Sequence, residues 1–391
     1  MTHLLIIEAN TPNLPAAARW FRDAFLAIDP AVTFATVAPY VTAAQAQDFD
    51  GVDGVIFTGS GVAWSTDDAR AAAQRDAMTL AFETGLPVWG SCNGMQLAAT
   101  VLGGTVGASP KGLEVGVAQN TRLTDAGKAH SMYAGRNDTF AVPCIHRDEV
   151  QTLPVGATLL AGNDHSPIQA FAHDKDGVDY WGTQYHPELR PTHIADFIRN
   201  KDGIFGSRAE LIVDLDCAET DPVSAARLGT TTAALHHDIR TIELSNWLTH
   251  AKNKASIRKI RGSHPDAEIF TFGDGPALCD RLNDLVVSGA KTATCGALRD
   301  FGPTGEAMPR VGRHDIATDW SGKPVALIRT VSVETKRFDQ VTWDFAQKEG
   351  ENDDLAGWRA DHRAFFERNG GFDPQMDLVC ETFELVRDLR D

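Results

Sequence analysis

The sequence has no long hydrophobic run and no excess of positive charge. No stretch approaches the roughly 18 apolar residues of a membrane-spanning helix, and the N-terminal MTHLLIIEAN lacks the basic flank and cleavage signal of a leader. The formal net charge is −17, from 36 Lys and Arg against 53 Asp and Glu. This balance argues against a general binder of nucleic acid or of membrane surfaces, so we expect a cytoplasmic protein with no membrane partner.

Cysteine is also scarce, and none of the cysteines forms a C-x-x-C pair. The six of them are Cys92, Cys144, Cys217, Cys279, Cys295 and Cys380. Their spacing indicates neither a disulfide framework nor a zinc site, and it fits a reducing cytosol. We therefore expect no metal and no other cofactor.

The apolar pattern indicates more than one domain. A chain of 391 residues is too long for one compact core. Short strand-like runs alternate with helix-like segments in the order 3–8, 15–27, 54–57, 67–84 and 87–89. This alternation predicts a doubly wound α/β sheet with parallel strands and with its sites at their carboxyl ends. Alternating runs between 114 and 181 indicate added antiparallel strands.

A basic stretch near the middle of the chain predicts a domain boundary. Residues 252–266, KNKASIRKIRGSHPD, carry five cations before the first acid and little apolar material, which is typical of a linker. We expect a first domain over 1–251 and a second over 267–391. In the second, one helix pattern at 276–288 and strand-like runs such as 325–333 predict a small α+β or barrel domain.

One cysteine stands between two glycines. The stretch Gly90-Ser91-Cys92-Asn93-Gly94 follows a strand-like run and precedes a helix-like segment, which is the layout of a nucleophile elbow. Glycines relieve the crowding of such a sharp turn, and the helix N-terminus favours a thiolate. The N–H of Asn93 would face a developing oxyanion. An inert buried cysteine is the competing interpretation.

A histidine and a carboxylate lie two residues apart in QYHPE, residues 184–188. His186 could take the proton of the Cys92 thiol, and Glu188 could orient the imidazole. The tripeptide alone is also common in surface turns. Together with the cysteine corner, in the chain order Cys, His, Glu, it predicts nucleophilic catalysis.

Residues 1 to about 250 resemble a class I glutamine amidotransferase domain of the stand-alone type, similar to the glutaminase half of GMP synthase. The matching motifs are GSCNGMQ at 90–96, GLEVGV at 112–117, IHRDEV at 145–150 and HPE at 186–188. The resemblance implies a flavodoxin-like mixed or parallel sheet. It also implies that Cys92 attacks the side-chain amide of glutamine or of a γ-glutamyl compound, that His186 protonates the departing amine and activates water, and that Glu188 positions His186.

The resemblance further places an oxyanion hole at Gly59 and Asn93, and it places Gly59 and Gln96 near the bound glutamine. One motif departs from the family pattern, because the loop that usually reads Gly-Gly-Pro is Thr58-Gly59-Ser60-Gly61 here. Backbone N–H groups survive this change, and the loss of a proline adds one. An inactive domain is the alternative.

Residues 268–388 resemble an ASCH domain, a PUA-like β-barrel family. The motifs are GAKTATC at 289–295, a V-G-x-x-x-x-A element at 311–317 and EGE at 349–351. The family is associated with RNA or nucleoside binding, and one branch hydrolyses N4-acylated cytosines with a Lys, a Thr and a Glu. The matching residues here are Lys291, Thr294 and Glu349. A solvated surface lysine, or a site that only binds a ligand, are the alternatives.

Other residues of the second domain are weaker candidates. Arg299 and Arg329 could anchor a ligand, although salt bridges on a sheet face explain them equally well. Trp343 and Trp358 fit a core position better than a stacking surface.

The sequence as a whole predicts a glutaminase-type hydrolase joined to a module for a nucleoside-like ligand or RNA. It contains no G-x-x-x-x-G-K-[ST] phosphate loop, so ATP-driven amide formation would need a separate synthetase partner. Two alternatives stay open. The first domain could be the scaffold of a nucleoside-sensing protein, or the second could be an N4-acylcytosine amidohydrolase. The sequence does not indicate an oligomeric state.

Overall fold

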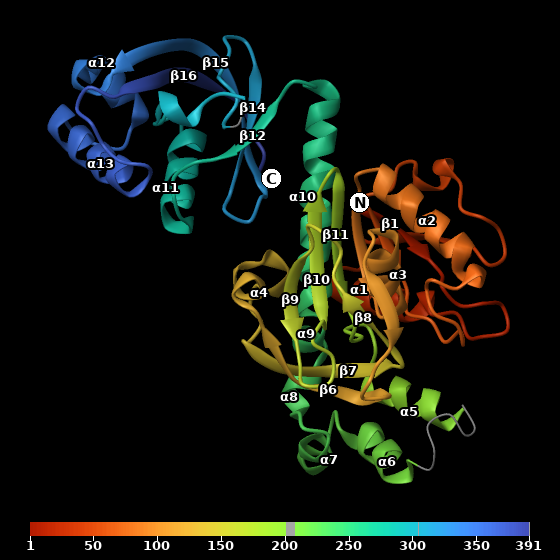
Figure 1. The fold of residues 1–391 in the computed structure, drawn as a ribbon. Coiled ribbons are helices and arrows are strands. Elements are labelled where there is room, and N and C mark those ends of the chain that lie inside the picture. Colours follow the sequence, from red (N-terminus) through yellow and green to blue (C-terminus); the bar gives the residue numbers. More distant parts are fainter. Residues whose placement is uncertain (201–207, 304, 391) are drawn as a thin grey trace. The chain divides into compact units, whose positions relative to one another are not determined.

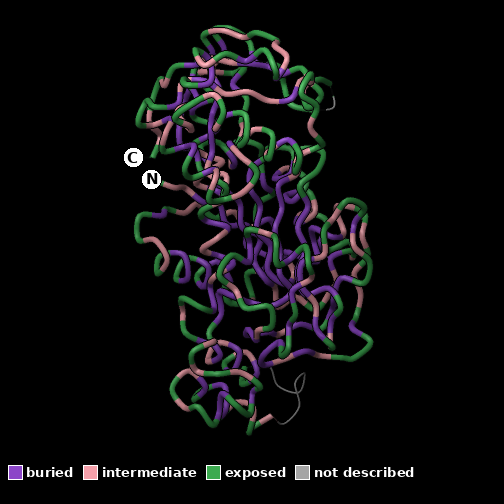
Figure 2. The backbone as a smooth tube through the Cα atoms, turned by 90° about the vertical axis from the view of Figure 1, so that its left-hand side faces the viewer, coloured by how far each residue is buried: buried purple, intermediate pink, exposed green. Residues whose placement is uncertain are grey.

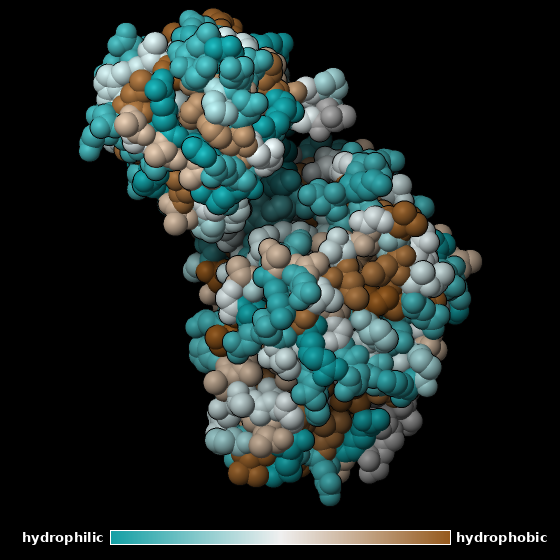
Figure 3. Space-filling model, turned by 60° about the vertical axis from the view of Figure 1, so that its left-hand side comes forward, coloured by the Kyte–Doolittle hydropathy of each residue, from teal (hydrophilic) through white to brown (hydrophobic). Residues whose placement is uncertain are grey.

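The computed structural model describes residues 1–200, 208–303 and 305–390. These residues form two compact units, Met1–Lys254 and Ala255–Asp391, which we describe separately (Figure 1). Within the described part of the chain, no helix combines the length and the apolar character needed to cross a membrane. Hydrophilic side chains cover most of the visible surface of each unit, with hydrophobic side chains in smaller patches (Figure 3).

The first unit is built on a nine-stranded mixed sheet. Its strands, in spatial order, are β2 (Thr33–Val37), β1 (His3–Ile7), β3 (Gly54–Phe57), β4 (Pro87–Ser91), β11 (Val178–Thr183), β10 (Ala170–Lys175), β9 (Thr158–Gly162), β6 (Glu114–Leu123) and β7 (Thr139–His146). The five strands from β2 to β11 are parallel, and the remaining pairs are antiparallel. The parallel part has the flavodoxin-like order 2-1-3-4-5, so the predicted doubly wound sheet with an antiparallel extension is confirmed.

The helices of the first unit are α1 (Ala18–Ile28), α2 (Ala72–Glu83), α3 (Asn93–Val101), α4 (Asp125–Ala129), α5 (Pro191–Arg199), α6 (Ala209–Cys217), α7 (Pro222–Arg227), α8 (Thr232–Leu235), α9 (His237–Arg240) and α10 (Ile242–Ser263). Two further strands, β5 (Thr105–Ala108) and β8 (Asp148–Thr152), form a separate antiparallel pair.

Both faces of the parallel sheet are covered. Along β1, Leu5 and Ile7 join a core that contains residues of α2 and α3, whereas Leu4 and Ile6 join a second core with residues of α1 and α10. Side chains alternate between the faces of a strand, which is why a continuous apolar run such as HLLII forms a central strand. Buried residues accordingly concentrate along the middle of this unit (Figure 2).

One strand of this sheet is absent from the sequence-based expectation. The edge strand β2 has the sequence TFATV, and all five of its residues are half-buried or exposed. It therefore lacks the apolar run by which its neighbours are recognised.

The described residues of the second unit contain a five-stranded sheet, the C-terminal end of α10 and three further α-helices. The strands, in spatial order, are β12 (Glu268–Thr271), β14 (His314–Thr318), β15 (Pro324–Arg337), β16 (Asp377–Asp388) and β13 (Ala293–Ala297). The helices are α11 (Pro276–Val287), α12 (Trp343–Ala346) and α13 (Leu355–Arg368). The expected α+β composition is present. The sheet is a curled half-barrel, and it does not close because β12 and β13 lie at opposite edges and do not pair with each other in the described residues.

The basic stretch 252–266, expected to be a linker, is mostly helical. The helix α10 continues through it to Ser263. Ile257 and Ile260 are buried in this part of the helix and pack with Ala267, Ile316 and Leu327. Two apolar residues three positions apart are enough to anchor one face of a helix, although the other side chains of the stretch are mostly polar.

We predict that Ser256→Pro lowers the free energy of unfolding of the second unit by about 3 kcal/mol, because proline within a helix removes a hydrogen bond and clashes with the preceding turn. Ser256 is exposed, so no buried contact confuses the result. Ser256→Ala is the control and should leave stability unchanged or slightly higher. Thermal unfolding measures both variants, and a neutral Ser256→Pro would contradict a continuous helix.

Candidate active site

Cys92 occupies a sharp corner between β4 and α3. It has φ 50° and ψ −102°, a backbone conformation that a residue with a side chain rarely adopts. Such strain costs about 1–3 kcal/mol and persists only where the surroundings impose it. The N–H of Cys92 donates to the carbonyl oxygen of Thr183 at the end of β11, 2.7 Å away. The corner is therefore held to the neighbouring strand.

The two glycines beside Cys92 are required by close backbone contacts. A Cβ atom on Gly94 would lie 2.5 Å from the carbonyl oxygen of Phe57, and one on Gly90 would lie 2.7 Å from the carbonyl carbon of Gly94 and would overlap the Tyr180 hydroxyl. No side chain fits either space. The crowding expected at a nucleophile elbow is thus present.

His186 and Glu188 follow the end of β11 and are both buried. The Nδ1 atom of His186 lies 2.7 Å from Oε1 of Glu188. The other carboxylate oxygen accepts a hydrogen bond from the Ser91 hydroxyl at 3.1 Å, and Ser91 in turn accepts one from the Trp89 indole at 3.0 Å. The carboxylate is therefore fixed from the strand that leads into Cys92.

The electrostatics of this pair favour a protonated imidazole. Burial by itself would lower the pKa of His186, but the negative charges of Glu188 and of the Cys92 sulfur outweigh it and raise that pKa to about 10.

A second buried cation supports the same segment. Arg240 of α9 is 3% exposed and donates a hydrogen bond from Nη1 to the carbonyl oxygen of Pro187. Burial lowers the pKa of Arg240 to about 10, against the raising effect of Glu219 and Glu188. Sequence reasoning missed Arg240, because an arginine in a short polar helix carries no motif.

The loop after β3 lies against the histidine. A Cβ atom on Gly59 would lie 2.7 Å from Cε1 of His186 and 3.7 Å from the Cβ atom of Cys92. The loop lacks the family proline, and Asn10 holds it in place. The Asn10 side-chain oxygen accepts from the N–H of Gly61 at 2.8 Å, and the Ser60 hydroxyl donates to the carbonyl oxygen of Ala9 at 2.7 Å.

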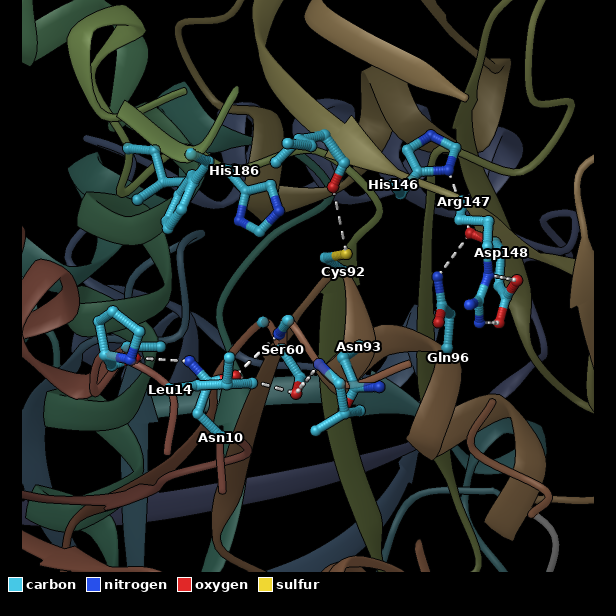
Figure 4. A pocket seen from close by; sticks show the side chains of 18 of the residues that line it. Asn10, Leu14, Ser60, Cys92, Asn93, Gln96, His146, Arg147, Asp148 and His186 are labelled. Atoms are coloured by element: carbon cyan, nitrogen blue, oxygen red, sulfur yellow. Dashed lines mark hydrogen bonds and ion pairs between the residues drawn. The ribbon is translucent and has the colours of Figure 1, made fainter. Parts of the chain in front are cut away.

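These residues line one cavity of about 250 Å³ at the carboxyl ends of β1, β3, β4 and β11. Among its lining residues are Asn10, Gly59, Ser60, Cys92, Asn93, Gln96, Arg147, Asp148, His186 and Glu188. In Figure 4, His186 and Leu14 lie on one side of Cys92, and Gln96, Arg147 and Asp148 lie on the other. Asn93 is the first residue of α3, where a backbone N–H has no partner within the helix.

The side-chain amide of Gln96 forms hydrogen bonds within the protein. Its Nε2 atom donates to the carbonyl oxygen of Asp148 at 2.6 Å and to Oε1 of Gln184 at 3.2 Å. Arg147 forms a two-point ion pair with the Asp148 carboxylate, with both N···O distances 2.7 Å. Gln96 thus fixes the segment that carries this charged pair at the cavity wall.

A buried polar network lies behind this wall. The Glu114 carboxylate accepts from His146 Nε2 at 2.8 Å and from the side chains of Asn163 and Gln169 at 2.7 Å each. Glu114, Cys144 and His146 are spaced closely enough to hold a metal ion. Hydrogen bonds already account for their grouping, since the carboxylate has a donor on each oxygen.

The second unit has its own cavity, of about 370 Å³, which Lys291, Thr294 and Glu349 all line. Lys291 is 2% exposed, and its Nζ atom lies 2.6 Å from Oε1 of Glu351 and 3.9 Å from Oε2 of Glu349. The structure therefore brings the three predicted residues to one cavity and adds Glu351 as the closest partner of the lysine.

Glu349 is buried and only half satisfied. Its Oε2 atom accepts from the Trp358 indole at 3.1 Å and lies 2.9 Å from Nε2 of His362, while its Oε1 atom has no hydrogen-bond partner. Cys295 is a neighbour, and burial together with the Glu349 charge raises the pKa of that thiol well above its usual value. A buried carboxylate oxygen without an N–H or O–H donor is unusual in a folded protein.

The His362 ring lies between two acceptors. Its Nδ1 atom is 3.0 Å from the carbonyl oxygen of Trp358, and its Nε2 atom is 2.9 Å from Oε2 of Glu349. Lys291 and His362 counteract the effect of burial, so that the pKa of Glu349 stays below its usual value.

The weaker candidates of the second unit lie away from this cavity. Arg299 donates to the backbone carbonyls of Asn369 and Gly371, and Arg329 pairs with Glu384 on the exposed sheet. Trp358 is fully buried and Trp343 packs against the same core. The core interpretation is confirmed for Trp358, whose indole N–H also binds Glu349.

Comparisons with known proteins define the class of each unit. A family model for glutamine amidotransferase class-I matches residues 31–202, and one for the ASCH domain matches residues 268–387. The chain belongs to the class I glutamine amidotransferase family and carries an ASCH domain after the amidotransferase unit.

Particular relatives refine this assignment. The chain is 32% identical to a Pseudomonas gamma-glutamyl-L-1-hydroxyisopropylamide hydrolase over 53% of its own length and 75% of that protein. It is 31% identical to the glutamine-hydrolysing GMP synthase of Thermomicrobium roseum over 50% of its length, but only 33% of that protein. An ASCH domain from Lactobacillus crispatus is 33% identical over 36% of this chain and 92% of that chain, with a TM-score of 0.31.

Proposed function

We propose that the first unit hydrolyses the amide bond of glutamine or of a γ-glutamyl amide, with Cys92 as the nucleophile. The observation that carries this proposal is the position of Cys92 on a strained corner, in one cavity with a histidine that a buried carboxylate keeps protonated. The names of the two curated relatives, one a γ-glutamyl amide hydrolase and the other glutamine-hydrolysing, support it.

The reaction proceeds in two steps. The Cys92 thiolate attacks the γ-carbonyl carbon, the C–N bond breaks, and the departing amine takes the proton of His186. Water then attacks the thioester, giving its proton to His186, and releases glutamate and the thiolate. Glu188 does not react, but it holds the ring and stabilises its charge.

Two backbone N–H groups would stabilise the oxyanion of each step. They belong to Gly59 and Asn93. Both residues line the cavity that contains Cys92. The charged pair Arg147 and Asp148 offers a cation and an anion to the zwitterionic head of a glutamyl group. That a separate ATP-using synthetase takes up the released ammonia remains a prediction from the sequence.

Cys92→Ala should reduce kcat/KM for L-glutamine or γ-glutamyl amides by about a thousand-fold or more, because the nucleophile of a catalytic triad is lost. Cys217→Ala is the matched control, since Cys217 is an exposed free cysteine. The electrophile 6-diazo-5-oxo-norleucine should label Cys92 far faster than the other five cysteines. Hydrolysis retained by Cys92→Ala would refute the proposal.

The pH dependence of kcat/KM tests the role of Glu188. The pKa of His186 is raised to about 10, so the imidazolium persists from neutral pH up to that value and activity should fall as the pH rises through it. Glu188→Gln removes the negative charge that counteracts the effect of burial on the pKa of His186. The alkaline limb should therefore move to lower pH, and an unmoved limb would contradict this role.

A second candidate function concerns the ASCH unit. We infer that its cavity binds a nucleobase-like ligand whose N–H edge satisfies Oε1 of Glu349, the buried oxygen without a partner. If the unit is catalytic, Lys291, Thr294 and Glu349 would hydrolyse an N4-acylcytosine bound in this cavity. If it only binds, the ligand could also be a base of an RNA.

Calorimetric titration with cytidine and N4-acetylcytidine tests the candidate, together with an assay for released acetate. Glu349→Gln should weaken binding at least about tenfold, the effect of about 1.4 kcal/mol. Arg329→Gln is the control, because its salt bridge lies on the exposed sheet. Absence of binding by the unmodified protein would exclude the candidate.

A further inference from the structure

The cavity of the first unit has two chemically different sides. One side carries the charged pair Arg147 and Asp148 together with Gln96, as seen to the right of Cys92 in Figure 4. Six other residues that line the cavity are apolar. They are Leu14, Ala17, Trp20, Leu113, Leu189 and Phe197.

Five of these six residues pack together in one cluster, which does not include Leu14. Ala17, Trp20 and Leu189 belong to one buried cluster, with Leu113 and Phe197 packed against it. Trp20 and Phe197 meet edge to face with ring centroids 5.0 Å apart. The side chains of this apolar wall are themselves uncharged, and the Arg19 guanidinium lies over the Trp20 ring, 4.6 Å from its centroid.

This wall lies beside the residue that releases the amine. The backbone N–H of Leu189 donates to the carbonyl oxygen of His186 at 3.2 Å, which places Leu189 in the same turn as the histidine. Leu14 lies on the side of Cys92 where His186 is (Figure 4). The side-chain amide of Asn10, on the same side of Cys92, is already engaged by Pro15, Ser60 and Gly61.

The order of the chemical groups along a γ-glutamyl amide determines which of them contacts the apolar wall. A glutamyl group whose charged head contacts Arg147 and Asp148 extends its γ-carbonyl toward Cys92. The substituent on the amide nitrogen must continue beyond Cys92 toward His186, because His186 protonates that nitrogen. Free glutamine has only hydrogens there and leaves the wall facing water.

We propose that this wall is a leaving-group subsite, and that the preferred substrate is a γ-glutamyl amide of an uncharged alkyl or aryl amine rather than glutamine. The inference rests on the proposed function and adds the class of amine. In the reaction, the C–N bond to the alkylamine breaks, the amine leaves with the proton of His186, and water later releases glutamate from Cys92. Burial of each additional methylene against the wall strengthens transition-state binding.

The test compares kcat/KM for L-glutamine, γ-L-glutamyl-isopropylamide and γ-L-glutamylglycine with the full chain. The isopropylamide should exceed glutamine by at least about tenfold, the discrimination that one or two methylenes give in an apolar pocket. γ-L-glutamylglycine, whose amine carries a carboxylate, should fall below the isopropylamide by a similar factor, because a carboxylate loses its hydration against apolar side chains and gains no burial of methyl groups.

Leu14→Asp and Phe197→Ser test the wall itself. Leu14 and Phe197 are half-buried at its rim, so both variants should fold, and each should lower the ratio of isopropylamide to glutamine kcat/KM at least about tenfold. Leu26→Asp is the matched control, since Leu26 is 41% exposed on α1 and does not line the cavity. It should change neither activity nor ratio.

The outcomes separate this inference from the proposed function. A kcat/KM for glutamine equal to or higher than that for the isopropylamide overturns the inference and leaves the hydrolase proposal intact. A preference for the isopropylamide that persists in both wall variants has the same consequence. If the unmodified protein hydrolyses none of the three amides, the proposed function fails and the inference fails with it.

Discussion

The buried pair of His186 and Glu188 is the interaction on which the account of the first unit depends. An isolated imidazolium in this position would be costly, because burial disfavours charge. The carboxylate at 2.7 Å reverses that preference. Ser91 and Trp89 hold one side of the carboxylate, and Arg240 ties down the carbonyl of Pro187 between the two residues. The pair is therefore positioned by the protein before any substrate binds.

The sheet explains why these groups meet. Asn10, Gly59, Cys92 and His186 each follow the carboxyl end of a different parallel strand, and those strands are neighbours in the order β1, β3, β4 and β11. Parallel strands bring their carboxyl ends to one edge, where side chains from distant sequence positions converge. The glycines at 90 and 94 then allow the backbone to approach closely enough for the Cys92 corner to form.

Sequence reasoning reached the central elements because they carry strong local signals. HLLII and GVIF are continuous apolar runs, and the glycines flanking Cys92 have a steric cause that the structure makes explicit. Residues that act through a second residue were missed. Asn10, Arg240 and His362 stand in ordinary polar surroundings in the sequence, and only the fold brings them to the loop, the Pro187 carbonyl and the Glu349 carboxylate. The composition of 252–266 predicted a linker, but most of this stretch is helical. Two buried isoleucines are enough to anchor a helix that is otherwise rich in cations.

The most direct test of the central claim is to look for the covalent intermediate. Rapid-quench mass spectrometry of the protein during turnover of a γ-glutamyl amide, followed by peptide mapping, should find a γ-glutamyl group on Cys92. The adduct should form and decay at rates that match turnover. Steady turnover without an adduct on Cys92, or with the adduct on another residue, would contradict the claim.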